Sequence, residues 1–405
     1  AGGGVGGGGG LWGVFYPRRA PAPRGGGGGG PRRGPPPPPA PVTAAPVAAA
    51  PVSAPELPMP TGVFAVGRDT WHVVDDSRRD PWVPSEPREL MVGLFYPALP
   101  GDGAVAPYAT PAEARLLVTR AGARSSDAGE AVRATGTHSV TGATPQPGSF
   151  PLVVLSPGFG MPRYTLTSLA EELASRGYVV AAVDHANEAM GVEFPDGRMS
   201  TCRACETLED QGAFALLVET RARDVSVLLD RLAAADAPPV ARSVDFTRIG
   251  MAGHSIGGAS AAAAMARDGR VRAGVNMDGA FFSLPPGDDP AGRAFLLLGT
   301  DDEVHRPGGS DPTWTLTWPA LGMWKRWVTF AGADHYSFTD IPVLAEQLDG
   351  SELGLPPGGT LSGQRAVALT RAYVGAFFDQ RLRGIPQPLL DGPTPGRPEA
   401  RFHML

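Results

Sequence analysis

A serine lies between glycines at residues 253–257, which read Gly-His-Ser-Ile-Gly and are followed by Gly258. The apolar run at residues 248–253 predicts a strand, and the alanine-rich residues 256–267 predict a helix. A serine on so tight a strand-to-helix turn lies at the carboxyl edge of a sheet, beside the N-terminus of the next helix, and needs glycines on both sides. This placement predicts that Ser255 is a nucleophile for acyl transfer; the alternative is a Gly/Ser turn that only packs a helix.

A serine hydroxyl needs a base to accept its proton, and in folds with this turn the chain order is serine, acid, histidine. The histidines that follow the turn are His305, His335 and His403. His403 lies near the end of the sequence, where we expect a frayed backbone. His335 follows a predicted strand at residues 326–330 across a short glycine-containing loop, which is where a base should approach the serine. We therefore predict His335 as the general base and keep His305 as the alternative.

Acidic residues follow two successive predicted strands, at residues 272–277 and 294–299. Asp278 comes directly after the first strand, and an acidic cluster at residues 301–303 follows the second. A lone carboxylate beyond an apolar strand is costly unless it is paired, whereas an acidic cluster fits a solvated turn equally well. By position alone, Asp278 and the cluster are equal candidates for the acid that orients the histidine.

The elements that must position these residues alternate between short β-rich runs and longer helical patterns from residue 61 onward. Such alternation is typical of a mostly parallel sheet covered by helices on both faces. Further strands are predicted at residues 90–96, 151–156 and 178–183, and further helices at residues 166–175, 209–235 and 362–383. Residues 185–208 lack periodicity and are predicted to be a long excursion, which often forms the rim or lid of a site. The predicted fold class is α/β, with one catalytic domain at residues 61–405.

The first sixty residues are mostly Gly, Pro and Ala and have too little apolar periodicity to offset the entropy of ordering them. We expect a disordered tail without chemistry at residues 1–60. The whole chain carries a net charge of −6. Because the tail is basic, the remainder is more acidic still, and it lacks the clustered Lys and Arg that a nucleic-acid partner requires.

No apolar stretch reaches the length of about 18 residues that a membrane span needs, so no transmembrane segment is expected. Small residues at positions 41–54 resemble the end of an export signal, although prolines interrupt the apolar region. An extracellular and a cytoplasmic location both remain open, as does the oligomeric state. No group of His, Asp and Glu has metal-ligand spacing, so we expect neither a metal nor another cofactor.

Cys202 and Cys205 are the two cysteines of the chain and form a C-x-x-C pair inside the long excursion. They are accompanied neither by the strand-to-helix turn of a thioredoxin-like site nor by the second ligand pair of a zinc site. A small loop disulfide is the first expectation, and two inert thiols are the alternative.

Four tryptophans, beginning with Trp314 and Trp318, precede the loop of His335. Tryptophan suits a boundary that is apolar on one side and wet on the other, so Trp314 and Trp318 could line a substrate pocket or touch a lipid surface. The alternative is that they pack in the core, as such side chains more often do.

With Ser255, Asp278 and His335 identified, the sequence resembles the platelet-activating-factor acetylhydrolase family of α/β-hydrolases over roughly residues 61–385. The resemblance rests on four segments: PLVVLSPGFG at residues 151–160, LASRGYVVAAVDH at residues 173–185, GHSIGG at residues 253–258 with Met277-Asp278 beyond it, and HYSFTD at residues 335–340. In that family the catalytic acid follows the strand directly after the nucleophile helix, which implies Asp278 as the acid. The resemblance also implies an oxyanion hole formed by the backbone N–H groups of Phe159 and Ile256.

The activity that the resemblance implies is hydrolysis of short-acyl esters through an acyl-enzyme. The first implied substrate is the sn-2 acetyl ester of platelet-activating-factor-like phospholipids, which would bring the protein into contact with a lipid surface. This chain has Pro157 where the animal members of the family have histidine. The alternatives are a broad carboxylesterase or polyester hydrolase, and a non-catalytic binding protein that keeps the same fold.

Overall fold

The computed structural model describes residues 54–403 except 102, 126, 208–210, 283–292, 349, 351–352 and 355–357. The first 53 residues of the tail predicted at residues 1–60 lie outside the described residues. Residues 54–60, which the sequence also places in the tail, pack against the sheet-bearing part: Leu57 is buried, and Arg371 donates hydrogen bonds to the carbonyl groups of Pro58 and Met59. The packed part therefore begins several residues before the boundary expected at residue 61.

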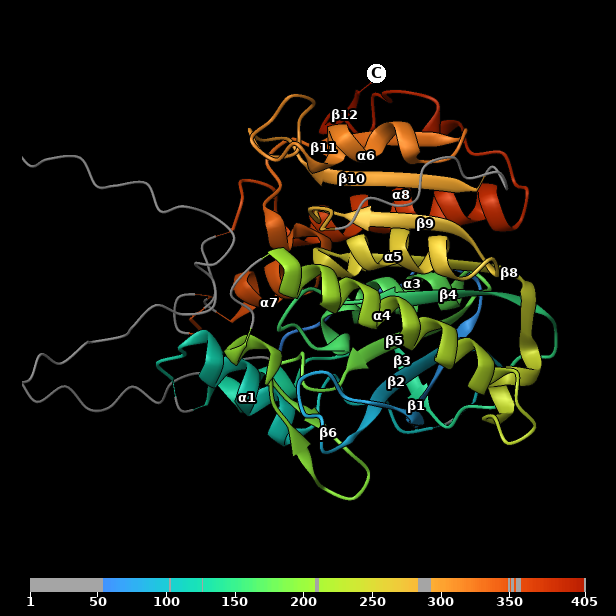
Figure 1. The fold of residues 1–405 in the computed structure, drawn as a ribbon, viewed down its shortest axis with the longest axis vertical. Coiled ribbons are helices and arrows are strands. Elements are labelled where there is room, and N and C mark those ends of the chain that lie inside the picture. Colours follow the sequence, from blue (N-terminus) through green and yellow to red (C-terminus); the bar gives the residue numbers. More distant parts are fainter. Residues whose placement is uncertain are drawn as a thin grey trace, which may run out of the picture.

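The described residues form a ten-stranded sheet whose central strands run parallel (Figure 1). In spatial order the strands are β12 (Ala400–His403), β11 (Lys325–Phe330), β10 (Ala294–Thr300), β9 (Val271–Met277), β8 (Val244–His254), β4 (Phe150–Ser156), β5 (Val179–His185), β2 (Pro87–Ala98), β1 (Ala65–Arg79) and β3 (Ser139–Thr141). The run from β5 to β11 is parallel, and β2 and β12 add to it in the antiparallel sense. Strands buried on both faces read as continuous apolar runs, as residues 152–155 of β4 do.

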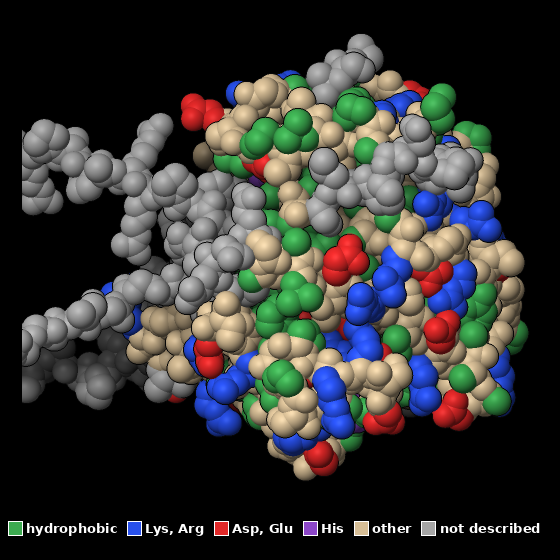
Figure 2. Space-filling view, in the orientation of Figure 1, with side chains coloured by type: hydrophobic (Ala, Val, Ile, Leu, Met, Phe, Trp, Pro, Cys, Tyr) green, Lys and Arg blue, Asp and Glu red, His purple; other side chains and the backbone are tan. Residues whose placement is uncertain are grey.

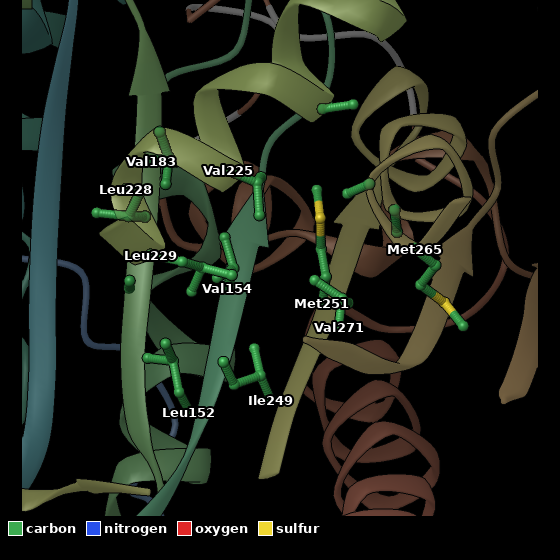
Figure 3. Close-up of a cluster of buried hydrophobic side chains, with 14 of the residues drawn as sticks. Leu152, Val154, Val183, Val225, Leu228, Leu229, Ile249, Met251, Met265 and Val271 are labelled. Atoms are coloured by element: carbon green, nitrogen blue, oxygen red, sulfur yellow. The ribbon is translucent and has the colours of Figure 1, made fainter. Parts of the chain in front are cut away.

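Helices cover both faces of this sheet. They are α1 (Pro111–Ala121), α2 (Ala128–Arg133), α3 (Thr167–Ser175), α4 (Gln211–Leu232), α5 (Ile256–Arg267), α6 (Thr313–Thr317), α7 (Ile341–Gln347) and α8 (Gly363–Leu382). α4 and α5 pack on one face, and α3 and α8 pack on the other (Figure 1). Figure 3 shows the first of these cores, where Leu152 and Val154 of β4 lie beside Val225 and Leu229 of α4. This is the α/β-hydrolase arrangement that the alternating pattern predicts.

The excursion between β5 and α4 contains the short strands β6 (Val192–Glu193) and β7 (Met199–Ser200). A disulfide joins Cys202 to Cys205 within it. Its first residues pair with the turn that follows β4: the N–H of Gly160 donates to the carbonyl of Glu188, and the N–H of Met190 donates to the carbonyl of Gly160. The start of the excursion therefore lies alongside that turn and is hydrogen-bonded to it.

Basic and acidic side chains lie interspersed on the face that carries α4 and α5 (Figure 2). None of the helices in the described ranges combines the length and apolar character that a bilayer crossing needs. The arrowheads of β9 and β10 in Figure 1 mark the carboxyl edge of the parallel strands, and the predicted chemistry-bearing residues lie along that edge.

Candidate active site

Ser255 lies on the turn between β8 and α5, where its backbone φ is 54°, in the left-handed region that non-glycine residues rarely adopt. Its N–H donates a 2.8 Å hydrogen bond to the carbonyl of Met277, at the end of β9. The glycines beside it have no space for a side chain: a Cβ on Gly253 would lie 2.1 Å from the carbonyl carbon of Gly257, and a Cβ on Gly257 would lie 2.1 Å from the carbonyl oxygen of Ser156. The glycines are thus a steric requirement of the turn.

Asp278 follows β9 directly, also with a positive φ, 62°. Its carboxylate is buried and divides its hydrogen bonds: Oδ1 accepts from the N–H of Thr300 at 2.7 Å, and Oδ2 lies 2.7 Å from Nδ1 of His335. Burial by itself would raise the pKa of Asp278, but the adjacent His305 and His335 rings and the Thr300 N–H hold that pKa well below its usual range. The carboxylate is therefore ionised at neutral pH.

His335 begins a short 3₁₀ turn, His335–Phe338, beyond β11. Its side chain is 18% exposed. The residue before the serine ties this loop to the nucleophile turn, because Nε2 of His254 lies 2.7 Å from the carbonyl oxygen of His335 and the two rings are 4.6 Å apart. The structure thus brings Ser255, Asp278 and His335 to one point on the carboxyl edge, through bonds between the loops that carry them.

The alternative histidines and acids lie around this cluster in other roles. Nδ1 of His305 is 3.1 Å from Oδ1 of Asp278, whereas His335 contacts the other oxygen of that carboxylate. The acidic cluster forms a turn, in which Asp301 pairs with Arg306 and Asp302 accepts from the N–H groups of residues 304 and 305. The expectation that His403 is frayed is wrong, because β12 pairs with β11 and Thr329 contacts the imidazole of His403.

The residues expected to form the oxyanion hole lie on two adjoining turns. Ile256 is the first residue of α5, and N–H groups in the first turn of a helix have no acceptor within it. The turn that carries Phe159 passes beside the serine, because a Cβ on Gly158 would lie 3.4 Å from Cβ of Ser255. Both amides therefore belong to segments that border the nucleophile.

The two tryptophans predicted for a pocket are placed differently from each other. Trp314 is fully buried, and its Nε1 donates a 2.6 Å hydrogen bond to the carbonyl of Gly279. It therefore packs in the core, which was the alternative to a pocket role. Trp318 is half-buried, with the ammonium of Lys325 4.9 Å from its ring centroid. Trp314 therefore supports the turn after Asp278 from beneath.

Two features of the site escaped the sequence reasoning. An aromatic group forms from three distant segments: Phe159 meets Phe214 edge-on at 5.9 Å, and Phe214 stacks on Phe282 at 5.0 Å. A buried ionic network lies beneath the turn after β4 and includes Arg221 of α4. Its signal in the sequence is a pair of charges, Arg221 and Asp224, among the apolar residues of a helix that should face the core.

Comparison with known proteins places this chain in a family. The model of the family described as platelet-activating factor acetylhydrolase, isoform II, matches residues 132–194 and 233–383. A protein of Arthroderma benhamiae named "Probable 1-alkyl-2-acetylglycerophosphocholine esterase" is 28% identical over 375 residues, covering 85% of this chain and 93% of that protein. A platelet-activating factor acetylhydrolase of Cavia porcellus is 23% identical over 257 residues, or 58% of each chain.

A solved structure is similar to this chain over a larger share of its length than the family model. A ferulic acid esterase from Streptomyces cinnamoneus is 43% identical, with a TM-score of 0.77, and the match covers 87% of this chain and 100% of that one. These relatives are all named as hydrolases of esters or acetyl groups. The chain is therefore an ester hydrolase of the α/β-hydrolase fold, and it belongs to the platelet-activating factor acetylhydrolase, isoform II, family.

Proposed function

We propose that this enzyme cleaves carboxylic esters through an acyl-enzyme formed on Ser255. The hydroxyl attacks the ester carbonyl while Nε2 of His335 accepts its proton, and the same nitrogen then donates the proton to the departing alcohol. Asp278 holds Nδ1 and stabilises the imidazolium. Water, activated by His335 in the same way, then releases the acid and restores the serine.

The observation that carries this proposal is the 2.7 Å contact between Nδ1 of His335 and Oδ2 of Asp278. Since an ionised carboxylate only accepts, Nδ1 must carry the hydrogen, and Nε2 then has the lone pair that a base needs. The amides of Phe159 and Ile256 are the donors proposed for the tetrahedral oxyanion, each contributing a few kcal/mol of transition-state stabilisation.

The first substrate proposed is a short-acyl ester of the kind named in the family, the sn-2 acetyl group of a 1-alkyl-2-acetylglycerophosphocholine. Contact with a lipid surface is part of this proposal. Leu316 and Met323, 61% and 92% exposed, are close to the half-buried Trp318 in the sequence and supply exposed apolar side chains for this contact. Sedimentation with phosphatidylcholine vesicles tests the contact: Leu316→Ser with Met323→Ser should reduce binding, whereas Val63→Ser, at a residue 91% exposed elsewhere, should not.

The second candidate is a carboxylesterase for aromatic acyl groups, and it is favoured by the cluster of Phe159, Phe214 and Phe282. Offset and edge-on aromatic contacts suit a planar ring that enters beside the oxyanion donor. The ferulic acid esterase that resembles this chain points to the same class of ester. Neither candidate changes the proposed chemistry at the serine.

A panel of esters separates the candidates. It contains 1-hexadecyl-2-acetylglycerophosphocholine, methyl ferulate and 4-nitrophenyl acetate, each assayed with the protein and with Ser255→Ala. A kcat/KM highest for the phospholipid supports the first candidate, and one highest for methyl ferulate supports the second. Full turnover by Ser255→Ala, or no labelling of the unmodified chain by a fluorophosphonate, would refute the serine mechanism.

A further inference from the structure

The turn that carries the proposed oxyanion donor Phe159 is held from beneath by a buried arginine. Arg221 of α4 is 1% exposed in its side chain, and its guanidinium donates in two directions. Nη1 reaches the carbonyl oxygen of Pro157 at 2.6 Å and the hydroxyl of Ser156 at 3.2 Å, while Nε donates to Oε2 of Glu188 at 2.7 Å. One side chain thus connects the end of β4, the start of the turn and the excursion that flanks it.

The turn itself fixes the direction of the Phe159 amide. The N–H of Met161 donates to the carbonyl of Gly158 at 3.1 Å, across a turn whose third residue, Gly160, has a φ of 75°. Because a trans peptide directs its C=O and N–H to opposite sides, a Gly158 carbonyl held inside the turn directs the Phe159 N–H outward. Any rotation of the preceding peptide, whose carbonyl belongs to Pro157, would move this donor.

In the network around Arg221, the chemistry of each group determines which atom donates and which atom accepts each hydrogen bond. Nδ1 of His185 lies 2.7 Å from the buried carboxylate of Asp224, so Nδ1 carries a hydrogen. Burial and the nearby Arg221 lower the pKa of His185, so its Nε2 accepts the hydroxyl of Ser156 at 3.1 Å. The Ser156 oxygen is then left to accept from Arg221. Rotation of the guanidinium would break this chain of bonds.

A second arginine closes the network on the side away from the turn. Arg88 of β2 is fully buried and donates to Glu188 at 2.6 Å, to Asp224 at 2.7 Å and to Asp80 at 2.8 Å. The positive charges hold the pKa of Glu188 below its usual value despite burial, which would raise it. Glu188 therefore stays ionised and fixes the orientation of Arg221. The backbone carbonyl of Glu188 also accepts from Gly160, so Glu188 holds one end of the turn directly and the other end through Arg221.

We infer that Arg221 is a positioning residue for the oxyanion hole: by binding the Pro157 carbonyl it sets the direction of the Phe159 N–H. This inference rests on the proposed function, because it takes the Phe159 amide as an oxyanion donor. Arg221 itself does not touch the substrate. Its loss should weaken stabilisation of the transition state while leaving substrate binding nearly unchanged.

The test compares an oxygen ester with its sulfur analogue. The C=S group of a thionoester accepts weaker hydrogen bonds than C=O, so a formed oxyanion hole favours the oxygen ester and a displaced donor reduces that preference. The substrates are 4-nitrophenyl acetate and 4-nitrophenyl thionoacetate. The variant is Arg221→Gln. If this variant does not fold, Arg221→Lys is used instead, because lysine keeps a positive charge beside Glu188 but lacks the planar guanidinium.

Arg68→Gln is the matched control, because Arg68 of β1 is also buried and also donates to a proline carbonyl, that of Pro107, at 2.7 Å. For Arg221→Gln we expect kcat/KM on the oxygen ester to fall about 10- to 100-fold, somewhat less than the loss of a donor itself costs. The fall should lie in kcat rather than KM, and the preference for oxygen over sulfur should shrink about tenfold. Arg68→Gln should lower the melting temperature without changing that preference.

Equal losses on both esters, or an unchanged preference in a folded Arg221 variant, would show that the arginine only supports the fold. Failure of the proposed function has a different signature, since it would appear as turnover by Ser255→Ala irrespective of Arg221. The two failures are therefore distinguishable within one set of assays.

Discussion

His254 donates a 2.7 Å hydrogen bond from Nε2 to the main-chain carbonyl of His335. Because a carbonyl only accepts, the single N–H of a neutral ring must be on Nε2. The ring is neutral, since burial, together with the adjacent His335, lowers the pKa of His254 to about 3. His254 is therefore neutral near pH 7 and keeps this hydrogen bond, which holds the loop of His335 beside the turn of Ser255.

Substitution of His254 by phenylalanine should separate these two loops. We expect a loss of about 1 kcal/mol in the free energy of unfolding from the missing hydrogen bond. We also expect kcat to fall on the order of tenfold, because small displacements of a catalytic group are costly. His138→Phe is the control, since Nε2 of His138 contacts the carbonyl of Leu57 at 2.7 Å, away from the site. Equal effects of the two variants on kcat would contradict the role given to His254.

Substitution of Asp278 by asparagine should lower kcat by about 10⁴-fold, because the amide would favour the wrong tautomer of His335. His305→Gln, which removes the group 3.1 Å from the other carboxylate oxygen, should cost far less. Since the pKa of Asp278 is held below its usual range, its ionisation should not contribute to the pH profile of kcat between about pH 5 and 9. Steady-state kinetics across this range check both expectations, and similar losses in the two variants would refute the assignment.

The free energy of unfolding should fall as the pH rises toward neutrality, because the folded protein holds a proton on Asp340. Burial raises its pKa to about 7, against hydrogen bonds from Ser168 that lower it. The unfolded chain releases this proton near the usual pKa of an aspartate, whereas the folded chain retains it to about pH 7. The contribution of Asp340 to the free energy of unfolding is therefore fully present below about pH 4. It falls as the pH rises to about 7, by at most about 4 kcal/mol.

Thermal unfolding of Asp340→Asn, which cannot titrate, measures this effect by difference. The variant should lose less stability than the unmodified protein between pH 5 and pH 8. Parallel curves for the two proteins over that range would show that Asp340 carries no such linkage.

Alanine at Gly257 should damage both stability and catalysis, because its Cβ would lie 2.1 Å from the backbone oxygen of Ser156. We expect a loss of about 3 kcal/mol or more in unfolding free energy, with activity reduced at least in proportion. Gly269→Ala is the matched control, since a Cβ there meets nothing within 4 Å. Chemical denaturation and 4-nitrophenyl acetate turnover provide the measurements, and a Gly257 variant that resembled the control would contradict the steric argument.

The central parallel sheet was predictable because its strands are buried on both faces and follow one another with helices between them. β1, in contrast, gave no clear pattern, because it carries Arg68, Asp69 and Asp75. Two of these charges are satisfied only after folding, since Arg68 donates to the carbonyl of Pro107 and Asp69 accepts from the hydroxyl of Tyr96. Strand β12 was missed for a similar reason, since four residues near the chain end pair only because β11 is already in place.

Chain order and turn chemistry were enough to select Ser255 and His335 as candidates, whereas Asp278 needed the family resemblance. The aromatic group and the network of Arg221 could not be predicted, because they join segments separated by long stretches of chain. Pro157 and Arg221, for example, are 64 residues apart, and no local pattern connects them. A buried arginine on an apolar helix face indicates that a partner exists but does not identify it.

Among the residues with a described backbone, three non-glycine positions have positive φ: Asn187, Ser255 and Asp278. Each such conformation costs on the order of 1 kcal/mol or more, and the surrounding packing must maintain it. Glycine would relax the backbone cost at each position, but it would also remove hydrogen bonds of the side chain, such as those that Asp278 accepts from the N–H of Thr300 and Asn187 accepts from the hydroxyl of Ser200. At Asn187 and Asp278, the side chain that the strained backbone carries therefore helps to keep that backbone in place.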